Sequence, residues 1–485
     1  MKSLAIQVSL LLLLTGLAGW LRFNHLGQVN LYNDEYYQFE TAIGWLKTGE
    51  WVRYDFYNEA SGKPYDRAKL FIVQVAASIR LFGESEWAAR LPAAVWGTLL
   101  IPIVIITLLR VTKNQLLAYG TGFALTFDYL SISLSRYVRM YSLLMVCSVL
   151  IIFLFYKCLE SKKRNLIILY GLSVIIVSLV SWFIFKELTL AVFGALGVYT
   201  TIRAGLYIYY RTIRDKYWFW CWVLGVIGVS IALILTLLRY NIVPLDAVII
   251  RAQPHWSYII DTLAGWYFPI FAGAFFVLGI ILSLKKIRSY LGLTAIVSIT
   301  VLVYFTFFSH RWDAQRYISI VVPAITLITV VGLVTTMKFL YSLLPGRNVF
   351  RVSLILPLVI LVGPALSFKT DFTTTELGYA DMKTAYSDVV DQVQPGDIVL
   401  MQGPRFFYWP DNSIPVYLLG GYKSLSLTEF KALTETSDTG VYVVYNTNHK
   451  RHLSDKVLNY IAKHFKKIYQ PTETNVLIYY LNRAK

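Results

Sequence analysis

Two adjacent carboxylates stand where a reaction could use them. Asp34 and Glu35 occur in the sequence NDEYY, a short distance beyond the first long apolar stretch. Neighbouring residues of a helix point about 100° apart, so these side chains do not face each other as a dyad. One can accept a proton as a general base while the other orients or caps. A structural interpretation stays open, because Asn33 or Asp34 is also a good helix N-cap.

Cationic side chains recur in several separate connections along the chain. Arginine forks and lysine ammonium groups both bind phosphate, the forks bidentately. The connections contain Asp66, Arg67 and Lys69 in YDRAKL, Arg136 and Arg139 in SRYVRMY, Lys186 beside Glu187, Arg251, and Arg311 and Arg316 in SHRWDAQR. Snorkelling to lipid headgroups explains any one cation, and surface solvation explains the YDRAKL group. A shared anionic ligand explains the set together, so we expect these residues to bind substrate.

Metal ligands are sparse. His255 and His310 stand alone without ligand spacing, and the sequence has neither a CxxC pair nor a glycine-rich phosphate loop. The sequence therefore assigns no cofactor to this protein. A divalent metal stays possible, with Asp66 and His255 as its weak candidate ligands.

The composition indicates the environment of these residues. Of 485 residues, 56% are hydrophobic and 15% are charged, whereas soluble domains carry about 25% charge. Disorder, collagen-like repeats and a disulfide-stapled secreted domain are excluded, because the three cysteines all fall in apolar stretches. A net charge of +17 would suggest nucleic acid in a soluble protein. In a membrane protein it indicates basic cytoplasmic loops, and we expect no nucleic-acid partner.

Apolar runs long enough to cross a bilayer predict a mainly α, polytopic membrane protein with about eleven transmembrane helices. The spans run near 4–22, 92–110, 115–133, 139–158, 165–183, 188–210, 217–238, 264–284, 289–308, 317–337 and 352–368. The first is expected to be a retained helix, because its apolar run is long and lacks a clear cleavage site. Short basic connections at five alternate loops predict a cytoplasmic N-terminus. The cations named above then lie at the outer face, against the usual charge bias.

Two regions outside the spans are long enough to fold. In the first outer loop, about 23–91, apolar periodicity at 36–46 and 70–82 predicts amphipathic helices at the membrane surface. Beyond 369, DIVLM, VYVVY and VLIYYL read as strands that alternate with helices near 379–393 and 454–467. We therefore predict a transmembrane domain, 1–368, and a small extracytoplasmic α/β domain, 369–485.

The motifs of the first outer loop resemble the C-type (GT-C) glycosyltransferases. DEYYQFETAIGWLKTGEWV, PYDRAKL and LFGESEWAARLPAAVWGTL are similar to the branch of protein O-mannosyltransferases and the lipid A aminoarabinose transferase. SRYVRMYSLL, FKELTLAVF and SHRWDAQRYISIVVPAI match later parts of the family pattern more loosely. The resemblance covers most of 30–330. It implies inverting transfer of a hexose or pentose from a polyprenyl-phosphate donor to a hydroxyl of a lipid, glycan or protein at the outer face of a cell membrane.

Carried over by position, Asp34 matches the family's catalytic aspartate and Glu35 its acidic neighbour. Asp66 and Arg67 match an acidic–basic pair near the donor phosphate or a metal. The family's following prolines are replaced here by Ala68 and Lys69, which leaves the choice between Arg67 and Lys69 open. Tyr141 stands where many relatives have aspartate.

The chemistry suits this interpretation. Displacing a phosphate from an anomeric carbon needs a base at the acceptor and cations at the leaving oxygen. Phosphate is already a fair leaving group, so one carboxylate suffices where a glycosidase uses two.

Two other classes of protein stay open. A transporter or flippase of a lipid-linked or anionic solute would place ionisable residues at mid-membrane depth and show repeated halves, whereas these charges gather at the outer margin. A non-catalytic binding or scaffold protein needs only that the acidic pair be structural.

Overall fold

The computed structural model describes residues 2–31, 33–210, 255–264, 272–307, 315–343, 381–402, 406–419, 425–446, 453–469 and 476–483. Its contacts divide the chain into two compact units. The helical unit comprises Met1–Asn24, Arg67–Phe71 and Leu91–Lys369, and the mixed unit comprises His25–Asp66, Ile72–Arg90 and Thr370–Lys485. Most of the segment predicted as the first outer loop, residues 25–66 and 72–90, thus groups with the C-terminal residues.

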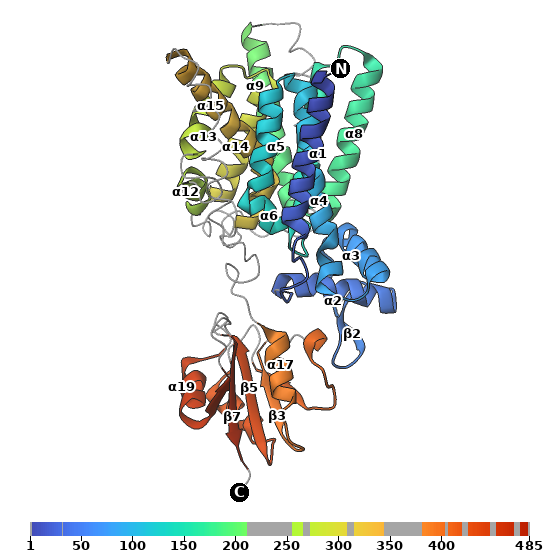
Figure 1. Ribbon diagram of the computed structural model, residues 1–485, viewed down its shortest axis with the longest axis vertical. Helices are drawn as coiled ribbons and strands as arrows, with labels where there is room; N and C mark the ends of the chain where they lie inside the picture. The colour runs from blue at the N-terminus through green and yellow to red at the C-terminus, as the bar shows by residue number, and fades with distance from the viewer. Residues whose placement is uncertain are drawn as a thin grey trace. The chain divides into compact units, whose positions relative to one another are not determined.

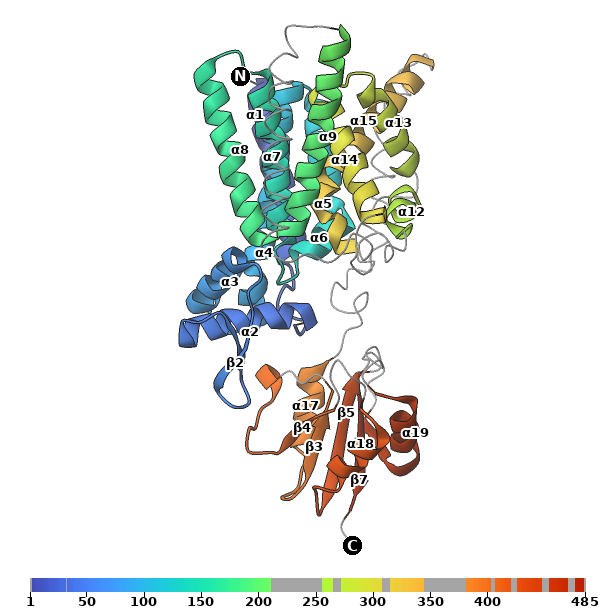
Figure 2. The ribbon, with the colours of Figure 1, turned by 180° about the vertical axis from the view of Figure 1, so that it is seen from behind.

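The helical unit is a bundle of long apolar helices (Figure 1 and Figure 2). They are α1 (Lys2–Phe23), α4 (Glu86–Thr112), α5 (Gln115–Phe127), α6 (Tyr129–Ser135), α7 (Tyr141–Glu160), α8 (Arg164–Ile184), α9 (Lys186–Tyr210), α12 (Ser257–Ala264), α13 (Ala272–Leu284), α14 (Tyr290–Phe307), the 3-10 helix η1 (Gln315–Val321) and α15 (Val322–Leu343). Figure 1 shows the N-terminus at one end of this bundle and α6 and α12 at the other.

Seven helices among the described residues are long and apolar enough to cross a membrane. They are Leu4–Phe23, Glu86–Thr112, Tyr141–Glu160, Arg164–Ile184, Lys186–Leu206, Tyr290–Phe307 and Arg316–Leu340. The prediction of a mainly α, multi-pass membrane protein is confirmed. The spans expected at 217–238 and 352–368 lie outside the described residues, so the count of eleven stays a prediction.

The span expected at 115–133 is divided into two helices. Asp128 has an extended backbone, with φ −67° and ψ 121°, and separates α5 from α6. Its carboxylate accepts a 2.7 Å hydrogen bond from the backbone N–H of Ser131 and so caps α6. Hydropathy alone continues through this position, because one capping residue hardly changes the average over a window.

Helices α13 and α15 pack backbone against backbone. A Cβ atom on Gly279 would overlap the carbonyl oxygen of Ile328, and one on Gly332 would overlap the carbonyl oxygen of Phe275. Small residues permit such close approach between membrane helices, where van der Waals packing drives association. The two glycines therefore set the distance at which α15, and η1 directly before it, is held.

The first outer loop contains the two helices expected from its periodicity, α2 (Asn33–Thr48) and α3 (Lys69–Phe82). Between them the structure adds an antiparallel hairpin, β1 (Val52–Asp55) and β2 (Ala60–Pro64), which was not predicted. The hairpin is tied to α2 by an ion pair of 2.5 Å between Arg53 and Glu40.

The C-terminal residues form the expected small α/β domain. Its sheet has the order β4-β3-β5-β7-β6, with β3 parallel to β4 and β5, and β7 antiparallel to β5 and β6. The strands are β3 (Ile398–Met401), β4 (Val416–Leu418), β5 (Gly440–Asn446), β6 (Lys466–Tyr469) and β7 (Val476–Asn482), and the helices are α17 (Met382–Val390), η2 (Phe406–Tyr408), α18 (Leu427–Thr434) and α19 (Asp455–His464). Strands β3, β5 and β7 and helices α17 and α19 correspond to the predicted segments.

Both faces of this sheet are covered, as the alternation of β3 requires. Val399 and Met401 pack in one apolar core with α17, whereas Ile398 and Leu400 pack in a second core with α18 and α19. The result is a three-layer α/β/α arrangement.

Candidate functional site

The acidic pair lies in the first turn of α2, and its two members have different surroundings. Glu35 is 1% exposed and Arg90 is 5% exposed, and together they form a bidentate ion pair. Arg90 Nε and Nη2 donate to the two Glu35 carboxylate oxygens, each at 2.9 Å. Asp34 is half-buried, so it keeps solvent access that Glu35 has lost. Of the two carboxylates, only that of Asp34 is partly exposed to solvent, while Glu35 is held in the protein interior.

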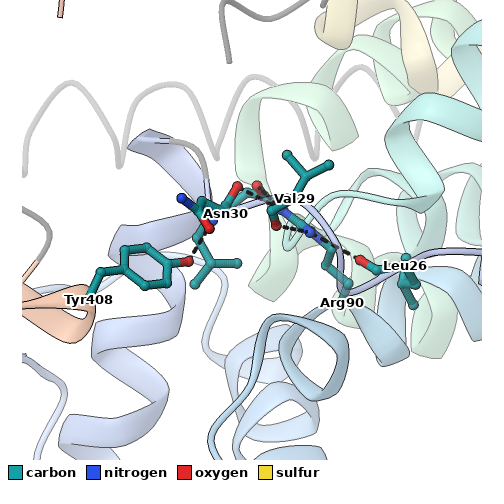
Figure 3. A network of polar contacts seen from close by, with 7 residues as sticks. Leu26, Val29, Asn30, Arg90 and Tyr408 are labelled. Carbon is teal, nitrogen blue, oxygen red and sulfur yellow. Dashed lines mark hydrogen bonds and ion pairs between the residues drawn. The ribbon is translucent and has the colours of Figure 1, made fainter. Parts of the chain in front are cut away.

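Arg90 also holds the chain that leads to the acidic pair (Figure 3). Its Nη1 donates to the carbonyl oxygens of Leu26 at 3.0 Å and Val29 at 2.6 Å, and its Nη2 donates to that of Asn30 at 3.1 Å. With the two bonds to Glu35, all five N–H groups of the guanidinium are used. The segment from Leu26 to Glu35 is thus wrapped around one side chain.

The YDRAKL residues lie at the start of α3. Asp66 and Arg67 are exposed and Lys69 is half-buried. Ala68, between them, has a positive φ of 53°, a left-handed conformation that turns the chain into the helix. Arg67 and Lys69 group with the helical unit and Asp66 with the mixed unit.

Two of the predicted cations lie on elements of the helical unit that pack together. Arg139, in the α6–α7 turn, has its guanidinium 5.8 Å from the ring centre of Tyr141 and is 9% exposed. Arg316, in η1, has its guanidinium 5.5 Å from the ring of Tyr317. Both cations act electrostatically on Tyr141, which is fully buried. Residues far apart in sequence therefore build one positively charged region at the bundle end that carries α6.

The α8–α9 turn, which carries Lys186, reaches the same region. Phe185 stacks on Tyr317 with ring centres 6.5 Å apart, and Ser181 and Thr189 share a hydrogen bond of 2.7 Å that closes the turn. Lys186 itself is exposed at the first position of α9. Two of the predicted cationic connections, the α6–α7 and α8–α9 turns, thus approach η1, which carries the third cation, Arg316.

Arg136, which was also predicted to bind substrate, contacts the end of α1. Its Nη1 donates to the carbonyl oxygens of Leu21 at 3.2 Å, Arg22 at 3.2 Å and Asn24 at 2.7 Å. These are the last carbonyls of α1 and of the turn that follows, which lack partners within the helix and favour a nearby cation. The geometry gives Arg136 a helix-capping contact.

Other predicted residues receive less support. Arg251 and Arg311 lie outside the described residues. His255 donates its backbone N–H to Thr306 at 2.7 Å, and its ring lies edge-on to Tyr258. In the part of the chain that the structure describes, no three His, Cys, Asp or Glu side chains gather as metal ligands.

Comparisons with known proteins relate this architecture to a class. Residues 69–180 match the family described as dolichyl-phosphate-mannose-protein mannosyltransferase, a segment that runs from α3 into α8. No curated protein matches the sequence. The solved structure of ArnT from Cupriavidus metallidurans bound to undecaprenyl phosphate is similar, with TM-score 0.60 and 13% identity over 99% of this chain and 98% of that chain. Its apo form gives TM-score 0.61 and 14% identity with the same coverage. The chain has the fold of the C-type (GT-C) glycosyltransferases.

The resemblance seen in the sequence is thereby confirmed at the level of fold. In this C-type fold, sequence reasoning missed one residue that organises the acidic loop. Arg90 was visible only as part of the motif WAARLP, and its partners are mostly backbone carbonyls that no pattern reveals. The one available signal was an arginine at the start of an apolar span, where a buried cation needs a carboxylate partner.

Proposed function

We propose that this chain is an integral-membrane glycosyltransferase that moves a hexose or pentose from a polyprenyl-phosphate donor to an acceptor hydroxyl, with inversion. The observation that carries the proposal is that Arg139 and Arg316 lie on elements that pack together, each with its guanidinium over a tyrosine ring. Fixed guanidinium groups in a buried place suit the phosphate of a lipid donor. The ArnT structure with undecaprenyl phosphate and the family match support a donor of this kind.

In the proposed reaction the acceptor oxygen attacks the anomeric carbon of the donor sugar. Asp34 takes the hydroxyl proton as general base, the new glycosidic bond forms, and the bond from the anomeric carbon to the phosphate oxygen breaks. Arg139 and Arg316, with Lys186 nearby, stabilise the negative charge of the departing polyprenyl phosphate. Phosphate needs no general acid to leave, so a single accessible carboxylate is enough.

Glu35 acts through Arg90 in this proposal. Both of its carboxylate oxygens already accept hydrogen bonds from the buried guanidinium, so Glu35 orders the loop and does not face the acceptor. Arg67, Lys69, Arg251 and Arg311 stay candidate contacts to the donor, and Arg136 is assigned to the end of α1. The acceptor, a lipid, glycan or protein, is left open.

The proposed orientation has the N-terminus in the cytoplasm and the sites of Asp34 and Arg139 outside. The basic connections between spans support it, for example 157–164 and 285–288. The protein would then act at the outer face of a cell membrane, where a lipid-linked donor is available and nucleotide sugars are not. Activity with and without a chelator tests whether Asp66 or His255 holds a divalent metal.

The deciding experiment uses the full-length protein in proteoliposomes with radiolabelled undecaprenyl-phosphate sugars and a membrane extract as the acceptor source. Asp34→Asn should lower transfer by about 10²–10⁴-fold, the usual contribution of a general base. Asp391→Asn, which changes an exposed carboxylate of the mixed unit, is the control. Unchanged transfer by Asp34→Asn would remove Asp34 as base, and label that crosses the bilayer still attached to its lipid would favour a transporter.

A further inference from the structure

The C-terminal α/β domain is joined to the acidic loop through η2. The Tyr408 hydroxyl accepts a hydrogen bond of 2.8 Å from the backbone N–H of Leu31 (Figure 3). In the opposite direction, the backbone N–H of Phe407 donates to the Tyr36 hydroxyl, also at 2.8 Å. Leu31, Tyr36 and Tyr408 are all buried. Each side of the contact thus supplies one tyrosine hydroxyl to one main-chain N–H of the other.

Aromatic rings fill the space around these hydrogen bonds. Phe407 packs edge-on against Phe39 with ring centres 4.7 Å apart, and lies 5.4 Å from Phe56. Tyr57 lies 4.8 Å from Phe406. Aromatic pairs of this kind add about 0.5–1.5 kcal/mol beyond the area that they bury. Because α2 contributes Phe39, the helix that begins beside Asp34 shares a core with the C-terminal domain.

Further polar contacts extend the interface on both sides. Asn30 Nδ2 donates to Asp381 Oδ1 at 3.2 Å. The Tyr57 hydroxyl donates to the carbonyl of Ile414 at 2.7 Å and accepts from the N–H of Val416 at 3.2 Å. The contact therefore spans the loop from before the acidic pair to the hairpin, which explains why these residues form one compact unit with the C-terminal domain.

The contacts bracket Asp34 in the sequence. Leu31 is held by Tyr408, Tyr36 is held by Phe407, and Glu35 is held by Arg90. We propose that the C-terminal α/β domain positions the active site, with Tyr408 and Phe407 of η2 fixing the segment that presents the Asp34 carboxylate. The inference rests on the proposed function, because it takes Asp34 as the catalytic base. It gives the C-terminal domain a role in catalysis that involves no contact with substrate.

Loss of these hydrogen bonds should displace the acidic segment and slow the reaction. A buried N–H that loses its acceptor carries a desolvation penalty, so the chain near Leu31 would shift to find a new partner. A displacement of about 1 Å at a reacting group can lower the rate by about 10²-fold. Burial also raises the pKa of Tyr408, so its hydroxyl stays protonated and neutral beside the Arg90–Glu35 pair.

The test compares Tyr408→Phe, Tyr36→Phe and the double variant with wild type, all as full-length protein in proteoliposomes. Each substitution keeps the ring and removes one acceptor. The matched control is Tyr442→Phe, because Tyr442 is buried and its hydroxyl donates to the carbonyl oxygen of Gln392, within the same domain. Hydrogen exchange of peptides covering 26–36 and steady-state transfer from radiolabelled undecaprenyl-phosphate sugars are measured for every variant.

We expect faster exchange of the 26–36 peptides in both single variants and a fall in kcat of about 10-fold to 100-fold in the double variant. The donor KM should stay within about twofold, because the phosphate-binding arginines are untouched. Tyr442→Phe should leave both measurements near wild type, even where it lowers the melting temperature equally. Unchanged exchange or unchanged kcat in the double variant would overturn the inference.

The two proposals fail in distinguishable ways. A wild-type protein that transfers no sugar counts against the proposed function alone. The exchange measurement needs no substrate, so it still decides whether η2 orders the acidic segment. Normal wild-type transfer with a double variant of equal kcat leaves the proposed function standing and removes the positioning role.

Discussion

Arg90 binds Glu35 through both carboxylate oxygens while its remaining N–H groups hold three backbone carbonyls of the preceding chain. One guanidinium thereby sets the path of the loop and the start of α2 together. The neighbouring carboxylate, Asp34, is the one that stays accessible to solvent. The two carboxylates therefore differ in burial, and the buried ion pair leads to the first prediction.

Glu35→Gln should destabilise the protein strongly. The change keeps the shape of the side chain and leaves the Arg90 cation buried without its counter-charge, a defect that costs about 3–5 kcal/mol in buried ion pairs. Arg90→Lys should not be tolerated either, because an ammonium group cannot serve a carboxylate and three carbonyls in a planar fork. The melting temperature of the detergent-solubilised protein measures both effects.

Replacing both partners gives an internal control for this pair. The variant Glu35→Gln with Arg90→Met carries no buried charge, so its loss of stability should be smaller than the sum of the two single losses. Strict additivity would mean that the two side chains do not act as a pair.

Arg139→Ala should weaken the use of the lipid donor. If Arg139 holds the phosphate in the ground state and in the transition state, kcat/KM for the donor should fall by about 10²–10³-fold, as for other lost charge-stabilising groups. Arg139→Lys should recover part of this loss, since it restores charge without the fork. Native mass spectrometry with undecaprenyl phosphate measures binding without any transfer. Arg110→Ala, an exposed arginine in the last turn of α4, is the control, and equal behaviour of the two alanine variants would favour snorkelling.

Arg136→Ala should affect stability and not the use of the donor, although Arg136 lies close to Arg139 in the sequence. Arg136 contacts the carbonyls that end α1, so its loss should lower stability by about 1–3 kcal/mol and leave the donor KM near wild type. Thermal unfolding and donor titration at a permissive temperature separate the two effects. A raised donor KM with unchanged stability would instead indicate that Arg136 binds the donor phosphate.

The sequence was informative where one kind of interaction dominates over a long stretch. Membrane helices follow from runs of apolar residues, and the strands β3, β5 and β7 follow from short β-branched and aromatic runs. The break at Asp128 was missed because it depends on one hydrogen bond to Ser131. Strand β4 and helix α18 were missed because they are short and lack a strong periodicity.

The sequence nominated the residues of the candidate site by their type, and it could not place their side chains. The predicted charge bias of the loops singled out Arg139 and Arg316, which lie on elements that pack together in the structure. The same argument included Arg136, and counting charges did not reveal that its guanidinium donates to the carbonyls at the end of α1. The contacts of Arg90 and Tyr408 join segments that lie far apart in the chain, and most of them use backbone atoms. They therefore cannot be inferred from the types of residue in the sequence.

Glycine substitutions at the α13–α15 crossing should show how closely the helical framework determines the site. In Gly279→Ala or Gly332→Ala the new Cβ meets a backbone carbonyl, of Ile328 or Phe275, which cannot rotate away as a side chain could. The helices must separate, at about 1–3 kcal/mol for overpacking. Because η1 leads directly into α15, the same shift should move Arg316 and lower kcat/KM for the lipid donor.

Gly194→Ala in α9 provides the matched control for this prediction. A Cβ at Gly194 meets no atom within 4 Å, so alanine should leave stability unchanged or raise it by about 0.5–1 kcal/mol through its helix propensity. Melting temperature and donor kcat/KM are compared for the three alanine variants. If Gly332→Ala behaves like Gly194→Ala in both measurements, the close approach of α13 and α15 does not hold the Arg316 end of the bundle in place.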